Sequence, residues 1–277
     1  MIKEIQQLLK LSKLYTGSID GQFGLESLRA LQKMPEAVTK TLQTMLKNGR
    51  YYQGNIDGIF GPQCYKALNS LIPAPVLTAE KLKKIYPGAS TRFISEINKQ
   101  AATWDITTKA QFCMFLANIL VESTGFNDKD LRENFNYKPE NLHATFKKYI
   151  HSVTQARALL AKGPEAVANH VYGGRLGNGV ANGDGWRYRG GGLIQTTGRY
   201  NYSVTGKGIN EDLVNFPHRI AEPDIAIKSA FYYWKSRNCG YHADRMEVKL
   251  CRKAVNGGTN GLDEVNEYFL RAWAYLF

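Results

Sequence analysis

Cysteine and histidine are scarce in this chain, and their spacing argues against several kinds of chemistry. The four cysteines, Cys64, Cys113, Cys239 and Cys251, form no Cys-x-x-Cys pair, so we expect reduced, mostly structural thiols, with a Cys239–Cys251 bridge after export as the alternative. The five histidines have no metal-ligand spacing, which disfavours a zinc amidase. No P-loop or dinucleotide fingerprint occurs, which argues against a nucleotide cradle. We therefore expect neither a metal nor an organic cofactor.

Long apolar runs are also missing. The first residues, Met1 to Gln7, lack the apolar core of a signal peptide, and no stretch approaches the length needed to span a membrane. We therefore expect neither secretion through a cleaved leader nor a transmembrane anchor.

Acidic residues are fewer than basic ones, 24 against 36, which gives a net charge of +12. The first 76 residues carry nine Lys or Arg against five Asp or Glu, so their net charge is +4 and that of the remaining residues is +8. Such a protein concentrates at polyanions, which include anionic wall polymers, an anionic outer membrane and nucleic acid. No basic cluster has the signature of a recognition helix, zinc finger or RNA-binding motif, which argues against nucleic acid.

The first seventy residues contain an internal repeat. Ile19-Asp20-Gly21 and Phe23-Gly24 return as Ile56-Asp57-Gly58 and Phe60-Gly61, at a constant offset of 37. Each copy predicts a helix, a tight Asp-Gly turn and a second helix. The repeat therefore predicts a small helical module in two copies.

Prolines mark a boundary after this repeat. Ile72-Pro73-Ala74-Pro75-Val76 predicts a short stiff connector, because proline fixes its own φ and biases the preceding residue away from helix. We therefore predict a module over residues 1–72, a linker over 73–76 and a second domain over 77–277, which is long enough for one sizeable core. Helical spacing dominates that domain, and strand signals are confined to short runs between Tyr188 and Thr196. The predicted fold class is mainly α with a short β-hairpin region.

The segment that ends at Glu122 has the pattern of a helix bearing a catalytic acid. Thr108 to Gln111 has capping-box spacing, and Glu122 continues an apolar stripe that predicts one buried face. Apolar surroundings disfavour a charged carboxylate, so such a group can hold a proton near neutral pH. Glu133 follows eleven residues later. A proton donor near an ionised carboxylate is the minimum for hydrolysis of a glycosidic bond. A helix-terminal glutamate followed by solvated loop acids is the alternative.

Glycine is concentrated downstream, where ten of the 26 glycines fall between Gly173 and Gly198. Glycine lets the backbone approach a ligand closely. The region also supplies flat aromatic faces and neutral hydrogen-bonding groups: Trp186, Tyr188, Tyr200, Tyr202, Gln195, Thr197 and Asn201. This mixture suits a sugar better than a phosphate. A glycine-rich surface loop with a short hairpin is the alternative.

Together with Asn256-Gly257-Gly258, these two stretches resemble the catalytic domain of glycoside hydrolase family 19, in its phage and bacterial endolysin branch. The resemblance covers roughly Leu77 to the C-terminus. It implies a lysozyme-like α+β catalytic domain in which Glu122 is the general acid and Glu133 the general base. It further implies that Thr197 helps to hold the attacking water, and that the sugar-binding positions are Gln195, Tyr200, Asn201 and Asn256.

The chain departs from the family pattern at three points. Val121 stands where histidine is usual, and Gly191 stands where arginine is common. The spacing between the two glutamates is also longer than in close relatives, so Asp128 and Asp130 remain alternatives to Glu133 as the base. The family's chemistry is inverting, which requires a separation of roughly 6.5–9.5 Å between the two carboxyl groups to admit the water.

The N-terminal repeat resembles the peptidoglycan-binding module found at the ends of cell-wall hydrolases. The two resemblances together predict a monomeric endolysin that cuts the β-1,4 bonds of bacterial peptidoglycan, as a lysozyme does, and lyses the host cell. Such a phage enzyme accumulates in the host cytoplasm until the membrane is permeabilised. A chitinase on the same scaffold is the closest alternative. A catalytically inactive wall-binding or nucleic-acid-binding basic protein is a more distant one.

Overall fold

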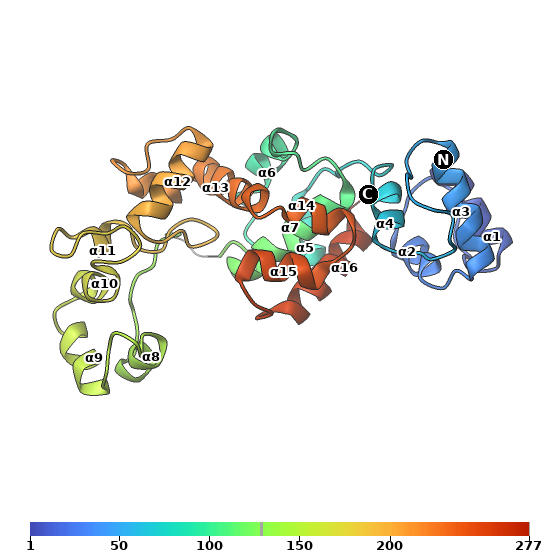
Figure 1. The fold of residues 1–277 in the computed structure, drawn as a ribbon. Helices are drawn as coiled ribbons and strands as arrows, with labels where there is room; N and C mark the ends of the chain where they lie inside the picture. The colour runs from blue at the N-terminus through green and yellow to red at the C-terminus, as the bar shows by residue number, and fades with distance from the viewer. Residues whose placement is uncertain (128–129, 277) are drawn as a thin grey trace. The chain divides into compact units, whose positions relative to one another are not determined.

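The computed structural model describes residues 1–127 and 130–276, and these residues are mainly helical (Figure 1). Strand pairing among them is confined to isolated antiparallel bridges: Pro73 with Thr108, Arg132 with Gly191, and Gly191 with Thr196. The predicted mainly α class is confirmed, and two of the three bridges meet at Gly191, inside the region of the expected hairpin. No helix in the described residues is both long and apolar enough to cross a membrane.

The chain divides into two compact units. The first comprises Met1–Asn127 and Tyr233–Phe277, and the second comprises Asp128–Tyr232. The predicted module of residues 1–72 lies wholly inside the first unit, and each unit is described below by itself.

The N-terminal repeat of the first unit folds as two copies of helix, turn and helix, as expected. Its helices are α1 (Ile2–Leu11), α2 (Leu25–Leu31), α3 (Glu36–Asn48) and α4 (Pro62–Asn69). A fully buried glutamine closes each turn. Gln6 Nε2 donates to Asp20 Oδ1 over 2.9 Å, and Gln43 Nε2 donates to Asp57 Oδ1 over 2.7 Å. The two copies therefore share the polar contacts that build them as well as a sequence pattern.

The connector after α4 is hydrogen-bonded to the chain that precedes α7 (Lys109–Glu122). Ala74 N donates to Thr107 O over 2.8 Å, and Lys109 N donates to Ile72 O over 2.9 Å. Asn69, at the end of α4, donates its side-chain amide to Asp244 O over 2.9 Å. These bonds hold the repeat against the rest of the first unit.

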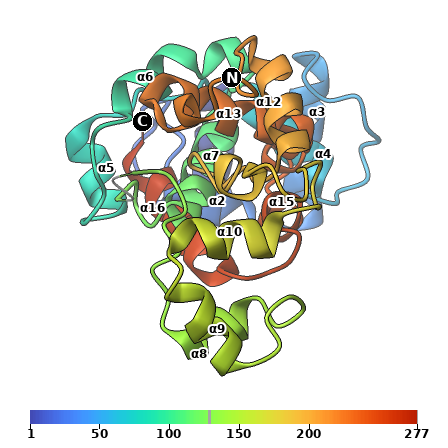
Figure 2. The same cartoon turned by 90° about the vertical axis from the view of Figure 1, so that its left-hand side faces the viewer.

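Helix α7 lies among the other helices of the first unit (Figure 2). Besides α1 to α4, these are α5 (Ala79–Ile85), α6 (Ile94–Gln100), η1 (Ala102–Trp104), α14 (Cys239–Asp244), α15 (Val248–Asn256) and α16 (Leu262–Tyr275). The predicted capping box is present, since Thr108 Oγ1 accepts from Gln111 N over 3.2 Å. The expectation of a single buried face is wrong, because every residue from Phe112 to Leu120 is buried. All four cysteines are buried free thiols, as expected.

The second unit has its own core. Its helices are α8 (Pro139–Thr145), α9 (Val153–Leu160), α10 (Pro164–Tyr172), α11 (Asp184–Arg187), α12 (Arg199–Ile209), η2 (Pro217–Ala221) and α13 (Pro223–Ser236), the last of which ends in the first unit. Helix α8 packs on α9, and α10 packs on α11 (Figure 1). The core between them comprises Phe135, Leu142, Ile150, Ala156, Val167, Ala168 and Val171. This packing positions the loop that carries Glu133 and the end of α10.

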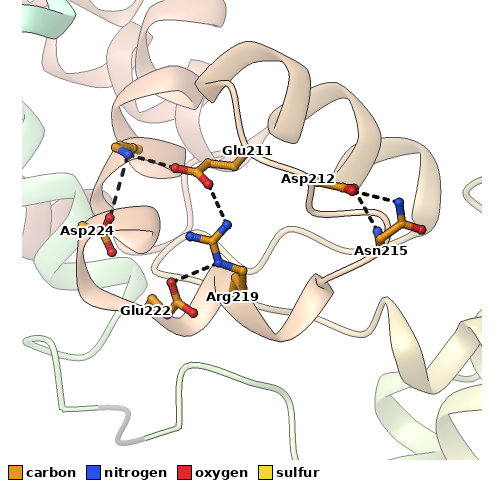
Figure 3. A network of polar contacts seen from close by, with 7 residues as sticks. Glu211, Asp212, Asn215, Arg219, Glu222 and Asp224 are labelled. Atoms are coloured by element: carbon orange, nitrogen blue, oxygen red, sulfur yellow. Dashed lines mark hydrogen bonds and ion pairs between the residues drawn. The ribbon is translucent and has the colours of Figure 1, made fainter.

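An ion-pair network fastens the segment between α12 and α13 (Figure 3). Glu211 lies at its centre, with Oε2 2.8 Å from Arg219 Nη1 and Oε1 3.0 Å from Lys228 Nζ. Arg219 also pairs with Glu222 over 3.3 Å. The hydrogen bond from Lys228 is the main reason that the pKa of Glu211 is lowered. The network holds the return of the chain from α12 into η2 and α13.

Candidate active site

Glu122 is the last residue of α7, and polar groups of α15 contact it. Its Oε1 accepts from Arg252 Nη1 over 2.5 Å and from Asn256 Nδ2 over 3.3 Å. The Arg252 side chain is only 3% exposed, and its Nε donates to Asn260 O over 2.7 Å. Arg252 and Asn256 are four residues apart, so one face of α15 presents both to the carboxylate.

This environment corrects the sequence interpretation. We expected apolar side chains around Glu122, but its carboxylate contacts a guanidinium and an amide, and its side chain is 24% exposed. The structure does bring Glu122 together with Asn256, a predicted sugar-binding residue. Sequence reasoning missed Arg252, although its place one helical turn before Asn256 was a usable signal.

Glu133 has different surroundings in the second unit. Its backbone N donates to Gly190 O over 2.9 Å, which holds the residue against the glycine-rich segment. Its Oε2 accepts from Tyr172 Oη over 3.0 Å and from Gly190 N over 3.4 Å. Burial raises the pKa of the Glu133 carboxyl, while the Tyr172 hydroxyl and the Gly190 amide act in the opposite direction. A half-buried carboxylate with a raised pKa is a stronger base than a solvated one.

Gly190 explains one use of glycine in this region. A Cβ atom on Gly190 would lie 2.5 Å from Gln195 Oε1 and 3.2 Å from Glu133 Oε2. Only glycine leaves room for both side chains in the positions they occupy. The segment therefore brings the predicted base and a predicted sugar-binding residue close to the same backbone atom.

Three more predicted residues follow on this segment. Thr197 Oγ1 donates to Gln195 O over 2.9 Å, and Asn201 Nδ2 donates to Thr197 O over 2.7 Å. Tyr200 is 66% exposed, so its ring is open to a ligand. Thus Glu133, Gln195, Thr197, Tyr200 and Asn201 all belong to the second unit, whereas Glu122 and Asn256 belong to the first.

The other aromatic residues of this segment are not open faces. Tyr188 is 2% exposed and Tyr202 is fully buried, so both are core residues. The guanidinium of Arg189 lies over the ring of Trp186, with Cζ 3.5 Å from the ring centroid. Of the four aromatic side chains expected to offer sugar platforms, Tyr200 alone is largely exposed.

The alternative bases differ in what the structure says of them. Asp130 is exposed, in contrast to the half-buried Glu133. Asp128 lies outside the described residues. Sequence reasoning did not identify Tyr172, whose hydroxyl contacts both Glu133 carboxylate oxygens, at 3.3 and 3.0 Å. It lies 39 positions away in the sequence, at the end of α10, and no local pattern marks it.

Comparison with known proteins identifies the class of this chain. A family profile described as chitinase class I, of glycosyl hydrolase family 19, matches residues 140–244. That range includes Gln195, Thr197, Tyr200 and Asn201. A glycosyl hydrolase family 19 domain-containing protein of Haemophilus influenzae is 39% identical over 183 residues, which cover 65% of this chain and 88% of the relative. The chain is therefore a glycoside hydrolase, and it belongs to glycoside hydrolase family 19.

Other similar proteins are chitinases by name. The acidic endochitinase of Petunia hybrida is 43% identical over 61 residues, which is 22% of each chain. Chitinase C from Streptomyces griseus has a crystal structure that aligns with a TM-score of 0.46 at 18% identity, over 73% of this chain and 95% of that one.

Proposed function

We propose that this family 19 hydrolase is an endolysin that cuts the β-1,4 bonds of bacterial peptidoglycan and so lyses the host cell. The observation that carries the choice of substrate is the N-terminal tandem repeat, whose two copies share both sequence and hydrogen bonds. That repeat resembles wall-binding modules, and it is attached to a hydrolase of a family that acts on polymers of N-acetylated amino sugars. The net charge of +12 favours an anionic polymer over an uncharged one.

In the proposed reaction, Glu122 donates a proton to the oxygen of the leaving sugar. Arg252 and Asn256 fix the position of its carboxyl group through contacts to Oε1. A positioned acid lowers the barrier because the leaving oxygen departs as a hydroxyl rather than as an alkoxide.

Glu133 takes a proton from the water that attacks the anomeric carbon on the opposite face of the sugar. Its raised pKa makes it a better proton acceptor, and the Tyr172 hydroxyl holds its carboxylate in place. The Thr197 hydroxyl supplies a further hydrogen bond to that water. Attack on the opposite face of a β-linkage gives the α-anomer, so the mechanism is inverting.

Sugar binding is assigned to Gln195, Tyr200, Asn201 and Asn256, which offer one exposed ring and three amide groups. The enzyme needs no cofactor in this scheme and acts as a monomer. As in phage lysis, it reaches the wall from the cytoplasm once the membrane has been opened, and its positive charge favours attachment to anionic outer-membrane surfaces.

A chitinase on the same scaffold is the second candidate, and the match to chitinase class I favours it. To separate the two, purified protein is incubated with peptidoglycan and with chitin, and new reducing ends are identified by mass spectrometry. New ends from peptidoglycan support the proposal. Cleavage of chitin alone would make the chain a chitinase, and cleavage of neither would leave a wall-binding or nucleic-acid-binding protein. Proton NMR of the first product tests inversion, because an initial β-anomer contradicts it.

A further inference from the structure

We propose that the second copy of the repeat, together with Arg245 at the end of α14, forms the site that holds the peptidoglycan strand. The site is a hollow of about 460 Å³, whose lining includes Tyr51, Gln53, Gln63, Lys66 and Arg245. The ligand class is an N-acetylated amino-sugar strand that bears carboxylates on its peptide stems. The inference rests on the proposed function, because the ligand is the polymer that the enzyme would cut.

Two cations line this hollow, from parts of the chain far apart in sequence. Lys66 is exposed on α4, and the guanidinium of Arg245 lies 4.1 Å from the centroid of the Tyr241 ring. Neither forms a salt bridge within residues 1–127 and 130–276. The acidic neighbour Asp244 is already bonded, since its carboxylate oxygens accept from Thr108 Oγ1 over 2.9 Å and from Gln111 Nε2 over 2.7 Å. The two cations are therefore placed to bind carboxylates of a ligand.

Neutral groups beside the cations suit a sugar. Tyr51 is 44% exposed and offers a flat face, and the exposed amides of Gln53 and Gln63 match the hydrogen-bonding groups of N-acetyl substituents. A second hollow of about 420 Å³ shares Gln53 and Gln63 and continues past Gly54 and Asn55. The two hollows share Tyr52, Gln53 and Gln63, so they adjoin each other. Asp57 also lines the second hollow, but its Oδ1 is bonded to Gln43 and to Ile59 N.

The first copy of the repeat serves as an internal comparison. At the offset of 37, Tyr51, Gln53 and Gln63 of the second copy correspond to Leu14, Thr16 and Glu26. Thr16 Oγ1 donates to Glu26 Oε1 over 2.7 Å, so these two side chains bond to each other. The first copy keeps the buried glutamine and the Asp-Gly turn but has neither the ring nor the two amides, and it adds a carboxylate. The ring and the two amides are therefore specific to the copy that adjoins Arg245.

The test compares two double variants of this chain, each of which removes two positive charges, in sedimentation binding to purified peptidoglycan on ice. Lys66→Ala with Arg245→Ala should weaken binding about tenfold, because two charge-assisted hydrogen bonds are lost. The control is Arg29→Ala with Arg237→Ala, which should bind as wild type does. Arg29 is the first-copy counterpart of Lys66, and Arg237 lies over Tyr233 with Cζ 5.1 Å from the ring centroid, much as Arg245 lies over Tyr241.

Further variants and substrates distinguish a wrong binding site from a wrong proposed function. Tyr51→Ala, an exposed-surface change, should also weaken binding to peptidoglycan, and it keeps the inference testable if the Arg245 variant fails to fold. Hydrolysis of short soluble oligosaccharides should not change in any of these variants. Equal binding by the two double variants, with wild-type peptidoglycan cleavage intact, would overturn this site and leave the proposed function standing. If the Lys66→Ala, Arg245→Ala variant lost as much binding to chitin as to peptidoglycan, the two cations would not be binding the carboxylates of the peptide stems. A wild-type chain that neither binds nor cuts peptidoglycan would refute the proposed function itself.

Discussion

Glu122 and Glu133 are held in contrasting ways in the two units of the molecule. A cation and an amide, both on one face of α15, contact Glu122 at the end of a helix. A neutral hydroxyl and a backbone amide contact Glu133 in a loop, and burial raises its pKa. The two carboxylates therefore have unlike environments, and their roles as acid and base follow from the family resemblance. A charged partner fixes the position of the Glu122 carboxylate, while desolvation raises the pKa of Glu133.

The largest expected effect is that of Glu122→Gln on hydrolysis. An amide keeps the shape but cannot donate a proton, so kcat/KM on peptidoglycan should fall by more than the roughly 10²–10⁴-fold typical of one general acid. An aryl glycoside whose leaving group needs no proton should be cut with a much smaller loss. If the aryl glycoside instead restored the activity of Glu133→Gln, Glu133 would be the acid and Glu122 the base.

Glu133→Gln should reduce the same rate nearly as far, because the water then has no positioned proton acceptor. Asp130→Asn is the matched control and should stay close to wild type, since an exposed loop carboxylate contributes a field that solvent screens. Steady-state rates for both variants on peptidoglycan measure this. A larger loss for Asp130→Asn than for Glu133→Gln would assign the role of base to Asp130.

Thr197→Val should give an intermediate loss, on the order of tenfold, because one hydrogen bond to the water is removed while both carboxylates remain. The loss should appear in kcat rather than in KM. Asn201→Ala, which removes a contact to the Thr197 carbonyl and a predicted sugar contact, should raise KM instead.

The two carboxylates should also differ in the sign of their effect on stability. Glu122→Gln leaves the buried Arg252 guanidinium without its anion, so the free energy of unfolding should fall by about 1–3 kcal/mol. Glu133→Gln should raise the melting temperature at pH 7. The pKa of Glu133 in the folded state lies above its ordinary value of 4.5. The wild type therefore loses stability as the pH rises from 4.5 through the folded-state pKa, because the buried carboxyl becomes charged. Below pH 4.5 the advantage of Glu133→Gln should vanish, and scanning calorimetry at several pH values checks this.

The smallest effect is expected for Glu211→Gln in the network of Figure 3, at less than about 1 kcal/mol, because its cationic partners are partly solvated. The pKa of Glu211 is lowered, so its contribution is present above its ordinary value of 4.5 and is lost as the pH falls below it. Urea unfolding at neutral and acidic pH measures the difference. Equal effects of Glu211→Gln and Glu122→Gln would show that burial of the cationic partner does not decide how much such a pair contributes.

Local patterns predicted the features that depend on nearby residues. The capping box of Thr108 and Gln111 and the two helix–turn–helix copies follow from spacing within a few positions. The full burial of α7 also had a signal in the sequence. Asn118 is the only polar residue between Phe112 and Leu120, so that run was too apolar for a helix with one exposed face.

The surroundings of the site residues depended on long-range packing and were not predictable in the same way. The partner of Glu122 lies 130 positions away at Arg252, and Tyr172 reaches Glu133 across 39 positions. Spacing also gave no means to separate the exposed Tyr200 from the buried Tyr188 and Tyr202, because all three stand in the same glycine-rich stretch. Which ring meets solvent is decided by the packing of the second unit.

The backbone hydrogen bonds between the connector and residues 107–109 have a consequence for the proposed action on an insoluble polymer. A flexible linker would let the catalytic groups move freely around the point where the repeat binds. Binding would then raise only the local concentration of enzyme at the polymer. Here the repeat and the helix that carries Glu122 belong to one compact body. If the repeat binds a peptidoglycan strand as proposed, that strand would reach Glu122 at a fixed distance along the polymer. The distance between the repeat and Glu122 would then set where the polymer is cut, and we expect fragments of preferred lengths rather than a random mixture.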